Sequence, residues 1–204
     1  MFSIWNKKKN DPKALGQIIW ASLMETIREI DTHFVLFLRS NNVNYTSDEL
    51  SIQTRGFGPN IFNYYEWSFI WIYTLTGLIS RSSHHRIASQ IEDGLLETAF
   101  SEFKVDKSKL EDIKIIGTKI VVAFSLIDTR FKNQSFDFNG RMTDETKLAF
   151  AHVANICAEI TLDEAIIISD LDQRGRELLV IELSKQFIIF YRDTGALIAS
   201  SQSK

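Results

Sequence analysis

The sequence predicts an α+β fold that is mostly α, with a bundle of five to six helices and a small C-terminal antiparallel β-meander. Apolar residues recur at spacings of three and four through most of residues 1–160, which is typical of amphipathic helices. Helix-capping residues precede several of these segments. Residues 161–204 instead combine β-branched and aromatic residues with glycine-containing turns, which favours a hairpin or meander. We expect the two parts to pack as one compact domain, and an all-α fold is the alternative.

The first helix is expected to begin after Asp11, whose side chain suits the N-cap position. Pro12 suits the first helical position, where its missing amide hydrogen breaks no bond. One face of this helix would carry the apolar residues Leu15, Ile18, Ile19, Leu23, Ile27, Ile30, Phe34 and Leu38. The run "RSNNVN" favours turns and ends the pattern. A short helical turn at Ser47 and the loop "TRGFGPN" are expected next.

Residues 61–80, "IFNYYEWSFIWIYTLTGLIS", form a long and strongly apolar stretch. Glu66 interrupts it, so the uncharged part extends only from Trp67 to Ser80. A membrane-spanning helix needs about 20 apolar residues. We therefore expect a central helix that its neighbours bury on most sides, and no transmembrane segment.

Three more helices are expected before residue 160. The first of them covers roughly residues 84–103. The second opens at "SKLE", where Ser108 and Glu111 match a capping box, and continues to Phe131. The third follows the polar loop "KNQSFDFNGRM" and has Thr143 as its N-cap.

The C-terminal segment is expected to form strands at residues 178–183, 187–191 and 196–199. The sequences "DQRG" and "DTG" are typical of hairpin turns in which glycine supplies a positive φ. Two alternatives remain open. The capping box "TLDE" favours a helical turn at residues 162–170. Residues 176–192 are also compatible with one buried helix closed by Gly195.

Composition argues against several classes of protein. The chain has 204 residues, of which 45% are apolar, and a formal net charge of −3. Its pI of about 5.8 and the absence of a basic stripe argue against binding of DNA or RNA. The N-terminal sequence "MFSIWNKKKN" lacks the apolar core of a secretory signal. Cys157 is the only cysteine, which fits a reducing, cytoplasmic compartment, and we expect it to be a buried thiol.

An acidic segment is the clearest charge bias in the chain. Residues 148–173 contain no lysine or arginine. The candidate partner-binding residues are the acidic residues of this segment, Glu159, Asp163, Glu164, Asp170 and Asp172. A surface patch of one sign would steer a basic partner protein and raise its association rate. A solvated helix end and turn is the structural alternative.

Two further groups of residues are candidate sites. The aromatic candidates, which could line a ligand pocket or an interface, are Tyr64, Tyr65, Glu66, Trp67 and Trp71. A helix this apolar is more often simply core. The cationic candidates, which could hold an anion at a helix start, are Arg81, His84, His85 and Arg86. A solvated helix start is the structural alternative for this group.

The sequence contains no diagnostic catalytic motif, and we expect neither a cofactor nor a metal. "DLDQRG" resembles the start of a calcium loop, but Arg174 and Ile181 occupy positions that need oxygen ligands. We expect a non-catalytic protein-binding module, in the form of an inhibitor or immunity-type protein that neutralises a basic bacterial toxin by surface occlusion. A helical sensor or carrier that binds an apolar ligand at the aromatic helix is the alternative, and an enzyme is third. The oligomeric state stays open.

Overall fold

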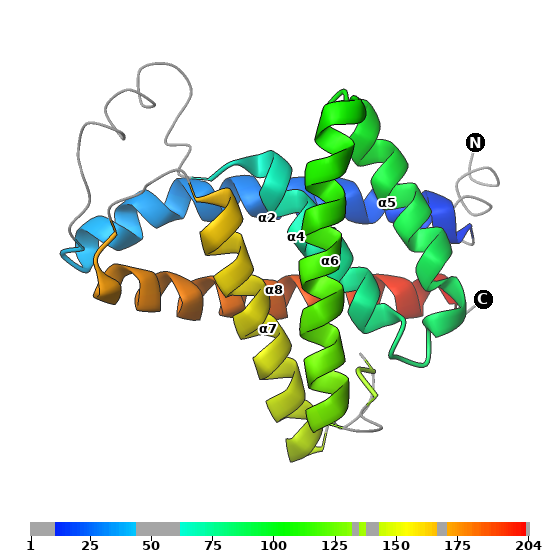
Figure 1. Ribbon diagram of the computed structural model, residues 1–204. Helices are drawn as coiled ribbons and strands as arrows, with labels where there is room; N and C mark the ends of the chain where they lie inside the picture. The colour runs from blue at the N-terminus through cyan, green and yellow to red at the C-terminus, as the bar shows by residue number, and fades with distance from the viewer. Residues whose placement is uncertain (1–10, 44–61, 132–134, 138–142, 167–170, 203–204) are drawn as a thin grey trace.

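The structure is a computed structural model that describes residues 11–43, 62–131, 135–137, 143–166 and 171–202 (Figure 1). Its elements are α2 (Pro12–Ser40), α4 (Tyr64–Ile79), the 3₁₀ turn η1 (His85–Ile87), α5 (Ala88–Glu102), α6 (Lys107–Arg130), α7 (Asp144–Ala165) and α8 (Gln173–Gln202). Within the described residues, strand-like pairing is limited to an isolated bridge between Phe62 and Ile166. The prediction of a mostly helical bundle is therefore confirmed, in its all-α form.

The helices cross one another around α4. In Figure 1, α2 and α8 run alongside each other in opposite directions, and α6 and α7 cross in front of them. α4 packs against α2, α5, α6 and α7, so it lies at the centre of the bundle. α5 packs along α2, and α7 packs along α8.

α4 is the buried central helix that the sequence predicts. The side chains with no exposed surface include Trp67, Phe69, Ile70, Trp71, Ile72 and Leu75. The helix is apolar all round because neighbouring helices enclose it. Its N-cap is Asn63, whose side-chain oxygen accepts a hydrogen bond from the Tyr65 amide at 3.1 Å. None of the helices in the described ranges combines the length and hydropathy that crossing a membrane requires.

Two glycines bring the backbones of α2 and α5 into direct contact. A Cβ on Gly94 would lie 2.1 Å from the carbonyl oxygen of Lys13, and a Cβ on Gly16 would lie 2.4 Å from that of Ile91. Both oxygens belong to helix backbone, so they cannot rotate out of the way. Because Gly16 and Gly94 have no side chain, the two helices can lie this close together.

Two of the predicted helix starts are confirmed at the level of the cap. The Asp11 carboxylate accepts a hydrogen bond from the Lys13 amide at 3.0 Å. The Thr143 hydroxyl accepts one from the Thr146 amide at 3.1 Å, at the start of α7. Each cap satisfies an amide that has no partner inside its helix.

The predicted cap of the helix before Phe131 is wrong by two residues. Asp106, and not Ser108, caps α6, because its carboxylate accepts from the amides of Ser108 and Lys109 at 3.0 and 3.1 Å. A carboxylate is favoured over a hydroxyl here, because its charge also stabilises the positive end of the helix dipole.

The predicted C-terminal β-meander is wrong. Residues 173–202 form one helix, α8, which passes without a turn through the strands expected at 178–183, 187–191 and 196–199. The alternative of a buried helix at residues 176–192 is correct in type, but Gly195 does not close it. Large side chains at helical spacing are buried along α8: Leu179, Leu183, Phe187, Phe190, Tyr191 and Ile198. Burial of this face outweighs the strand preference of the β-branched residues between them.

The expected hairpin turn "DQRG" is the start of α8. The Asp172 carboxylate accepts a hydrogen bond from the Gly175 amide at 2.6 Å. A Cβ on Gly175 would lie 2.5 Å from Cγ1 of Val43, so close packing explains this glycine and a positive φ does not. The "DTG" sequence lies inside α8. "TLDE" continues α7 to Ala165 instead of opening a new helix, so the helix runs across the expected boundary at residue 160.

Cys157 is a buried thiol, as predicted. It is 1% exposed, and burial raises the pKa of its thiol to about 12. The predictions for Ser47, for the loop at residues 54–60 and for residues 1–10 lie outside the described residues.

Candidate functional site

The outer surface of α6 carries a row of exposed apolar side chains. Ile115, Val122 and Leu126 are separated by seven and four residues, so they share one face of the helix. Their exposed fractions are 49%, 55% and 66%, and Leu148 on α7 is 53% exposed. The buried face of α6 is formed by other residues, Ile113, Ile116, Ile120, Phe124 and Ile127. Large apolar side chains grouped on a surface are typical of contact sites.

α7 adjoins this row along one edge. Lys119, one turn after Ile115 on the same face of α6, forms an ion pair with Glu164 of α7. Toward the opposite end of α6, the rings of Phe131 and His152 lie 5.5 Å apart. The exposed surfaces of the two helices are therefore neighbours. We call Ile115, Val122, Leu126, Leu148, Glu159 and Asp163 together the α6–α7 face.

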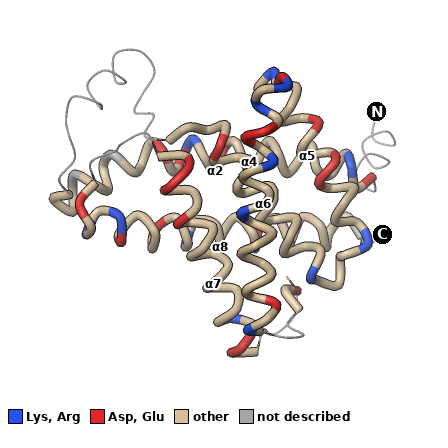
Figure 2. The backbone as a smooth tube through the Cα atoms, viewed as in Figure 1, with Lys and Arg blue, Asp and Glu red and all other residues tan. Residues whose placement is uncertain are grey.

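Two of the predicted acidic residues belong to the exposed surface of α7. Glu159 is exposed and forms no ion pair with another described residue. Asp163 pairs with Arg176 of α8 at 2.6 Å, yet its side chain remains 60% exposed. Figure 2 shows acidic residues at both ends of α7 and none in its middle.

The other acidic candidates have structural partners. Glu164 is paired with Lys119, as described above. Asp172 accepts the hydrogen bond that begins α8. Asp170 lies outside the described residues. The acidic segment is thus less uniformly charged than the sequence alone indicates, because Lys119 and Arg176 reach it from other helices.

Trp67 and Trp71 of the aromatic candidates are core residues. Both have no exposed surface, and their rings lie 5.7 Å apart. Phe62 packs on Trp67 at 4.3 Å and Phe187 packs on Trp71 at 5.1 Å between ring centroids. None of the described cavities is lined by either tryptophan. Their indole N–H groups have no hydrogen-bond partner among the described residues.

The two tyrosines connect α4 to its neighbours. The Tyr64 hydroxyl donates to the buried Asp31 carboxylate of α2 at 2.6 Å. The Tyr65 hydroxyl donates to the carbonyl oxygen of Lys109 on α6 at 3.0 Å. Burial raises the pKa of Tyr65 to about 12, and burial together with the bond to Asp31 raises the pKa of Tyr64. Both side chains are therefore neutral hydroxyl donors within the fold.

Glu66 is the charged member of the aromatic group. It is partly buried, and its Oε2 atom has no hydrogen-bond partner among the described residues. Burial raises the pKa of its carboxyl, and the nearby carboxylates of Asp112 and Glu164 add to this effect. Ionisation of Glu66 therefore costs folding free energy.

The predicted cationic cluster is balanced by carboxylates. Arg81 donates from Nε and Nη2 to the two carboxylate oxygens of Asp128 at 2.9 and 2.6 Å. The hydrogen bond from Arg81 lowers the pKa of Asp128. The Asp137 carboxylate accepts from the Ser83 amide at 2.6 Å, and it lies near His84. The remaining two candidates, His85 and Arg86, are exposed.

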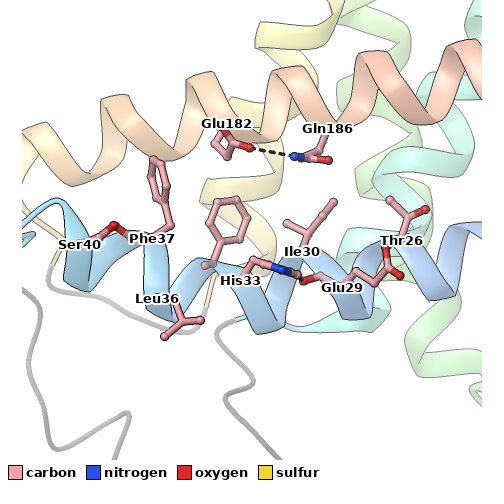
Figure 3. A pocket seen from close by; sticks show the side chains of 10 residues that line it. Thr26, Glu29, Ile30, His33, Leu36, Phe37, Ser40, Glu182 and Gln186 are labelled. Carbon is pink, nitrogen blue, oxygen red and sulfur yellow. Dashed lines mark hydrogen bonds between the residues drawn. The ribbon is translucent and has the colours of Figure 1, made fainter.

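A cavity of about 550 Å³ lies between α2 and α8 (Figure 3). Its apolar wall comes from α2 and consists of Ile30, Phe34, Leu36 and Phe37. Its polar lining includes Glu29, His33, Glu182 and Gln186. The Gln186 amide donates to the Glu182 carboxylate at 2.8 Å. An apolar wall with a few polar groups is typical of small-molecule sites.

Residues suited to metal binding or nucleophilic chemistry are dispersed in the part of the chain that the structure describes. No group of three or more His, Cys, Asp or Glu side chains in this part could hold a metal ion. Cys157 is a buried, protonated thiol, and His152 packs on the Phe131 ring.

The exposed row on α6 is absent from the sites predicted from the sequence, although the sequence contains its signal. Ile115, Val122 and Leu126 are apolar but fall off the stripe that faces the core. A second apolar face on an amphipathic helix indicates a second contact surface.

A scan against models of protein families, a search of curated proteins and a search of solved structures gave no match to this chain.

Proposed function

We propose that this protein is a non-catalytic binding module that covers part of a partner protein with its α6–α7 face. The observation that carries this proposal is the exposed row formed by Ile115, Val122 and Leu126. The partner presents an apolar docking surface bordered by lysine or arginine side chains.

Burial of the apolar row supplies the affinity. Full burial of an aliphatic side chain contributes about 1.5–3 kcal/mol. The three side chains of the row are already roughly half-buried, so each contributes about 1 kcal/mol on docking. Side chains near the centre of an interface account for most of its binding free energy.

The carboxylates of α7 supply the preference for a basic partner. Glu159 and Asp163 are exposed beside the apolar row, and α7 has no lysine or arginine from Leu148 onward. Carboxylates at the rim of an interface mainly accelerate association with a basic protein. Inhibition of a basic toxin by occlusion, as in an immunity protein, is the specific form of binding that this charge bias favours.

Affinity capture with matched surface variants tests the proposal. Ile115→Asp changes the α6–α7 face, and Ile181→Asp changes α8 at a residue with a similar exposed fraction, 52% against 49%. The partner retained by the unmodified protein from the cells that make it is identified, and its affinity for each variant is then measured. Ile115→Asp is expected to weaken binding about tenfold or more, because it places a charge in the apolar contact. Ile181→Asp is expected to change it by about twofold or less.

Charge variants test the preference for a basic partner. The double variant Glu159→Gln and Asp163→Asn is expected to slow association and to flatten its dependence on salt between about 50 and 500 mM, because screening then has less charge to act on. If the partner binds Ile115→Asp and Ile181→Asp with equal affinity, the assignment of binding to the α6–α7 face is contradicted. A captured partner that is acidic at its contact surface contradicts the charge preference.

A second candidate function is a helical carrier or sensor for an apolar ligand. The cavity between α2 and α8 favours it, because Ile30, Phe34, Leu36 and Phe37 give that cavity an apolar wall. Native mass spectrometry of the purified protein tests it. A bound small molecule that is lost in Phe37→Asp supports this function, and a spectrum of the protein without ligand at every mild condition contradicts it.

A further inference from the structure

A groove of about 410 Å³ lies between α4, α5 and α6, on the side of α6 that does not face α7. Its lining includes Tyr73 and Thr76 from α4, Glu92 from α5 and Phe124 from α6. This volume falls within the range of about 300–1,000 Å³ that small-molecule sites occupy.

Two glycines shape the aromatic wall of the groove. A Cβ on Gly77 would lie 2.4 Å from Cε2 of Phe124, so only glycine lets this ring lie against α4. A Cβ on Gly117 would lie 3.4 Å from the Tyr73 ring, so that ring packs over the glycine. Each ring therefore lies directly against the backbone of a neighbouring helix.

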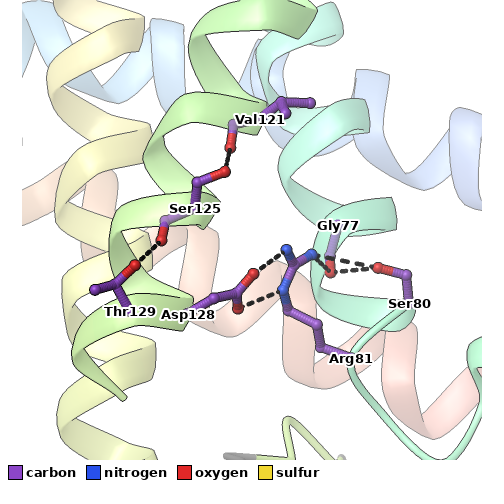
Figure 4. A network of polar contacts seen from close by, with 7 residues as sticks. All are labelled: Gly77, Ser80, Arg81, Val121, Ser125, Asp128 and Thr129. Carbon is purple, nitrogen blue, oxygen red and sulfur yellow. Dashed lines mark hydrogen bonds and ion pairs between the residues drawn. The ribbon is translucent and has the colours of Figure 1, made fainter. Parts of the chain in front are cut away.

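The arginine that lines the groove is already neutralised. Arg81 forms two hydrogen bonds with Asp128, at 2.9 and 2.6 Å, and a third with the carbonyl oxygen of Gly77 at 2.9 Å (Figure 4). Its guanidinium also lies 4.3 Å from the centre of the Phe124 ring. Arg81 thus lines the groove as the cation of a neutral pair with Asp128, and it has little capacity left for an anionic ligand.

Glu92 carries the uncompensated charge of the groove. It is partly buried and forms no ion pair with another described residue. Burial raises the pKa of its carboxyl, the neighbouring Asp93 adds to this, and a hydrogen bond with Thr76 opposes it. The Tyr73 hydroxyl lies close enough for the Glu92 charge to raise its pKa, after the larger effect of burial. A partly buried carboxylate without a cation pays part of the cost of desolvation, so a bound cation would relieve that cost.

We propose that this groove binds a small organic cation, a primary amine or guanidinium on a short apolar stem, with Glu92 as its counter-ion. The Tyr73 side chain supplies an aromatic surface beside that carboxylate, which favours a cation over a neutral group. The Thr76 and Ser125 hydroxyls line the same groove and accept hydrogen bonds from the N–H groups of the ligand.

The test uses benzylamine and agmatine as cationic probes and benzyl alcohol as the neutral counterpart of benzylamine. Amide resonances of the ¹⁵N-labelled protein are followed as each probe is added, up to about 10 mM, where even millimolar affinities are detected. At least one amine is expected to give saturable shifts confined to α4, α5 and α6. Benzyl alcohol is expected to give no saturable shift.

Two charge-neutralising variants of α5 complete the test. Glu92→Gln keeps the shape of the side chain and is expected to weaken amine binding about tenfold or more. Asp93→Asn removes the adjacent, exposed carboxylate and is expected to change the affinity about twofold or less. The amide spectrum of Glu92→Gln reports whether that variant is folded. Failure of both amines to bind, equal binding of the amine and the alcohol, or unchanged affinity in a folded Glu92→Gln variant would each overturn the proposal.

Discussion

The contact between α2 and α5 gives a sharp prediction about stability. In Gly94→Ala, the new Cβ would lie 2.1 Å from the carbonyl oxygen of Lys13, whereas ordinary contacts begin at 3.4 Å. The two helices would have to move apart by roughly 1 Å, because the obstacle is backbone and cannot change rotamer. Gly16 lies in the same contact, on α2, and it has no side chain that could move to make room for the new methyl group.

The size of the effect follows from two opposing contributions. Overpacking of a well-packed interior costs about 1–3 kcal/mol, and a rigid obstacle places this site at the upper end. Alanine is favoured over glycine in a helix by about 1 kcal/mol, which offsets part of that cost. The net loss is about 2 kcal/mol, which corresponds to a midpoint about 4–8 °C lower for a chain of this size.

Thermal unfolding followed by circular dichroism measures the effect, with Gly117→Ala as the matched control. Gly117 also lies inside a helix, but a Cβ there would meet Tyr73 at an ordinary 3.4 Å. Without a clash, only the helix preference of alanine remains, so Gly117→Ala is expected to raise stability by about 0.5–1 kcal/mol. A Gly94→Ala protein as stable as the unmodified one would refute the close approach of α2 and α5.

Three further substitutions test other parts of the fold. Thr143→Ala is expected to lower the free energy of unfolding by about 1 kcal/mol in urea titrations, and Thr143→Ser is expected to retain it, because the lost group is the hydroxyl that caps α7. Tyr191→Phe is expected to cost about 1–3 kcal/mol by the same measurement, since the buried hydroxyl donates to the carbonyl oxygen of Phe136 at 2.7 Å; an unchanged midpoint would contradict that bond. Glu66→Gln is expected to stabilise the protein at pH 7 and to have little effect near pH 4. The pKa of this carboxyl is raised in the folded state. Its ionisation therefore lowers the stability of the folded protein progressively as the pH rises from the unfolded-state pKa toward the folded-state pKa. A Glu66→Gln protein with no gain at pH 7 would contradict the burial of that charge.

The helical part of the fold is readable from the sequence because caps and periodicity agree there. Asp11 and Thr143 cap the helices they are expected to cap, and the core stripe of α6 follows the apolar pattern. α8 is predicted incorrectly because its β-branched residues favour strands locally and its glycines favour turns. Its length and its buried face depend on contacts with α7 and the core, which local preferences do not contain.

The candidate sites are harder to predict because partners from other helices change them. Lys119 pairs with Glu164 and Arg176 pairs with Asp163, across sequence separations of 45 and 13 residues. The groove at Glu92 depends on three helices and has no local motif. The exposed row on α6 could be found from the sequence, since its residues are apolar and lie off the core stripe.

Site-specific photo-cross-linking in the cells that make the protein tests the role of the α6–α7 face most directly. A photoreactive amino acid replaces Val122 in one variant and Ile181 in the other, at side chains that are 55% and 52% exposed. We predict that a polypeptide rich in lysine and arginine at the cross-linked site is captured from position 122 and is not captured from position 181. The same products from both positions, or a partner captured from position 181 alone, would contradict a binding function for this face.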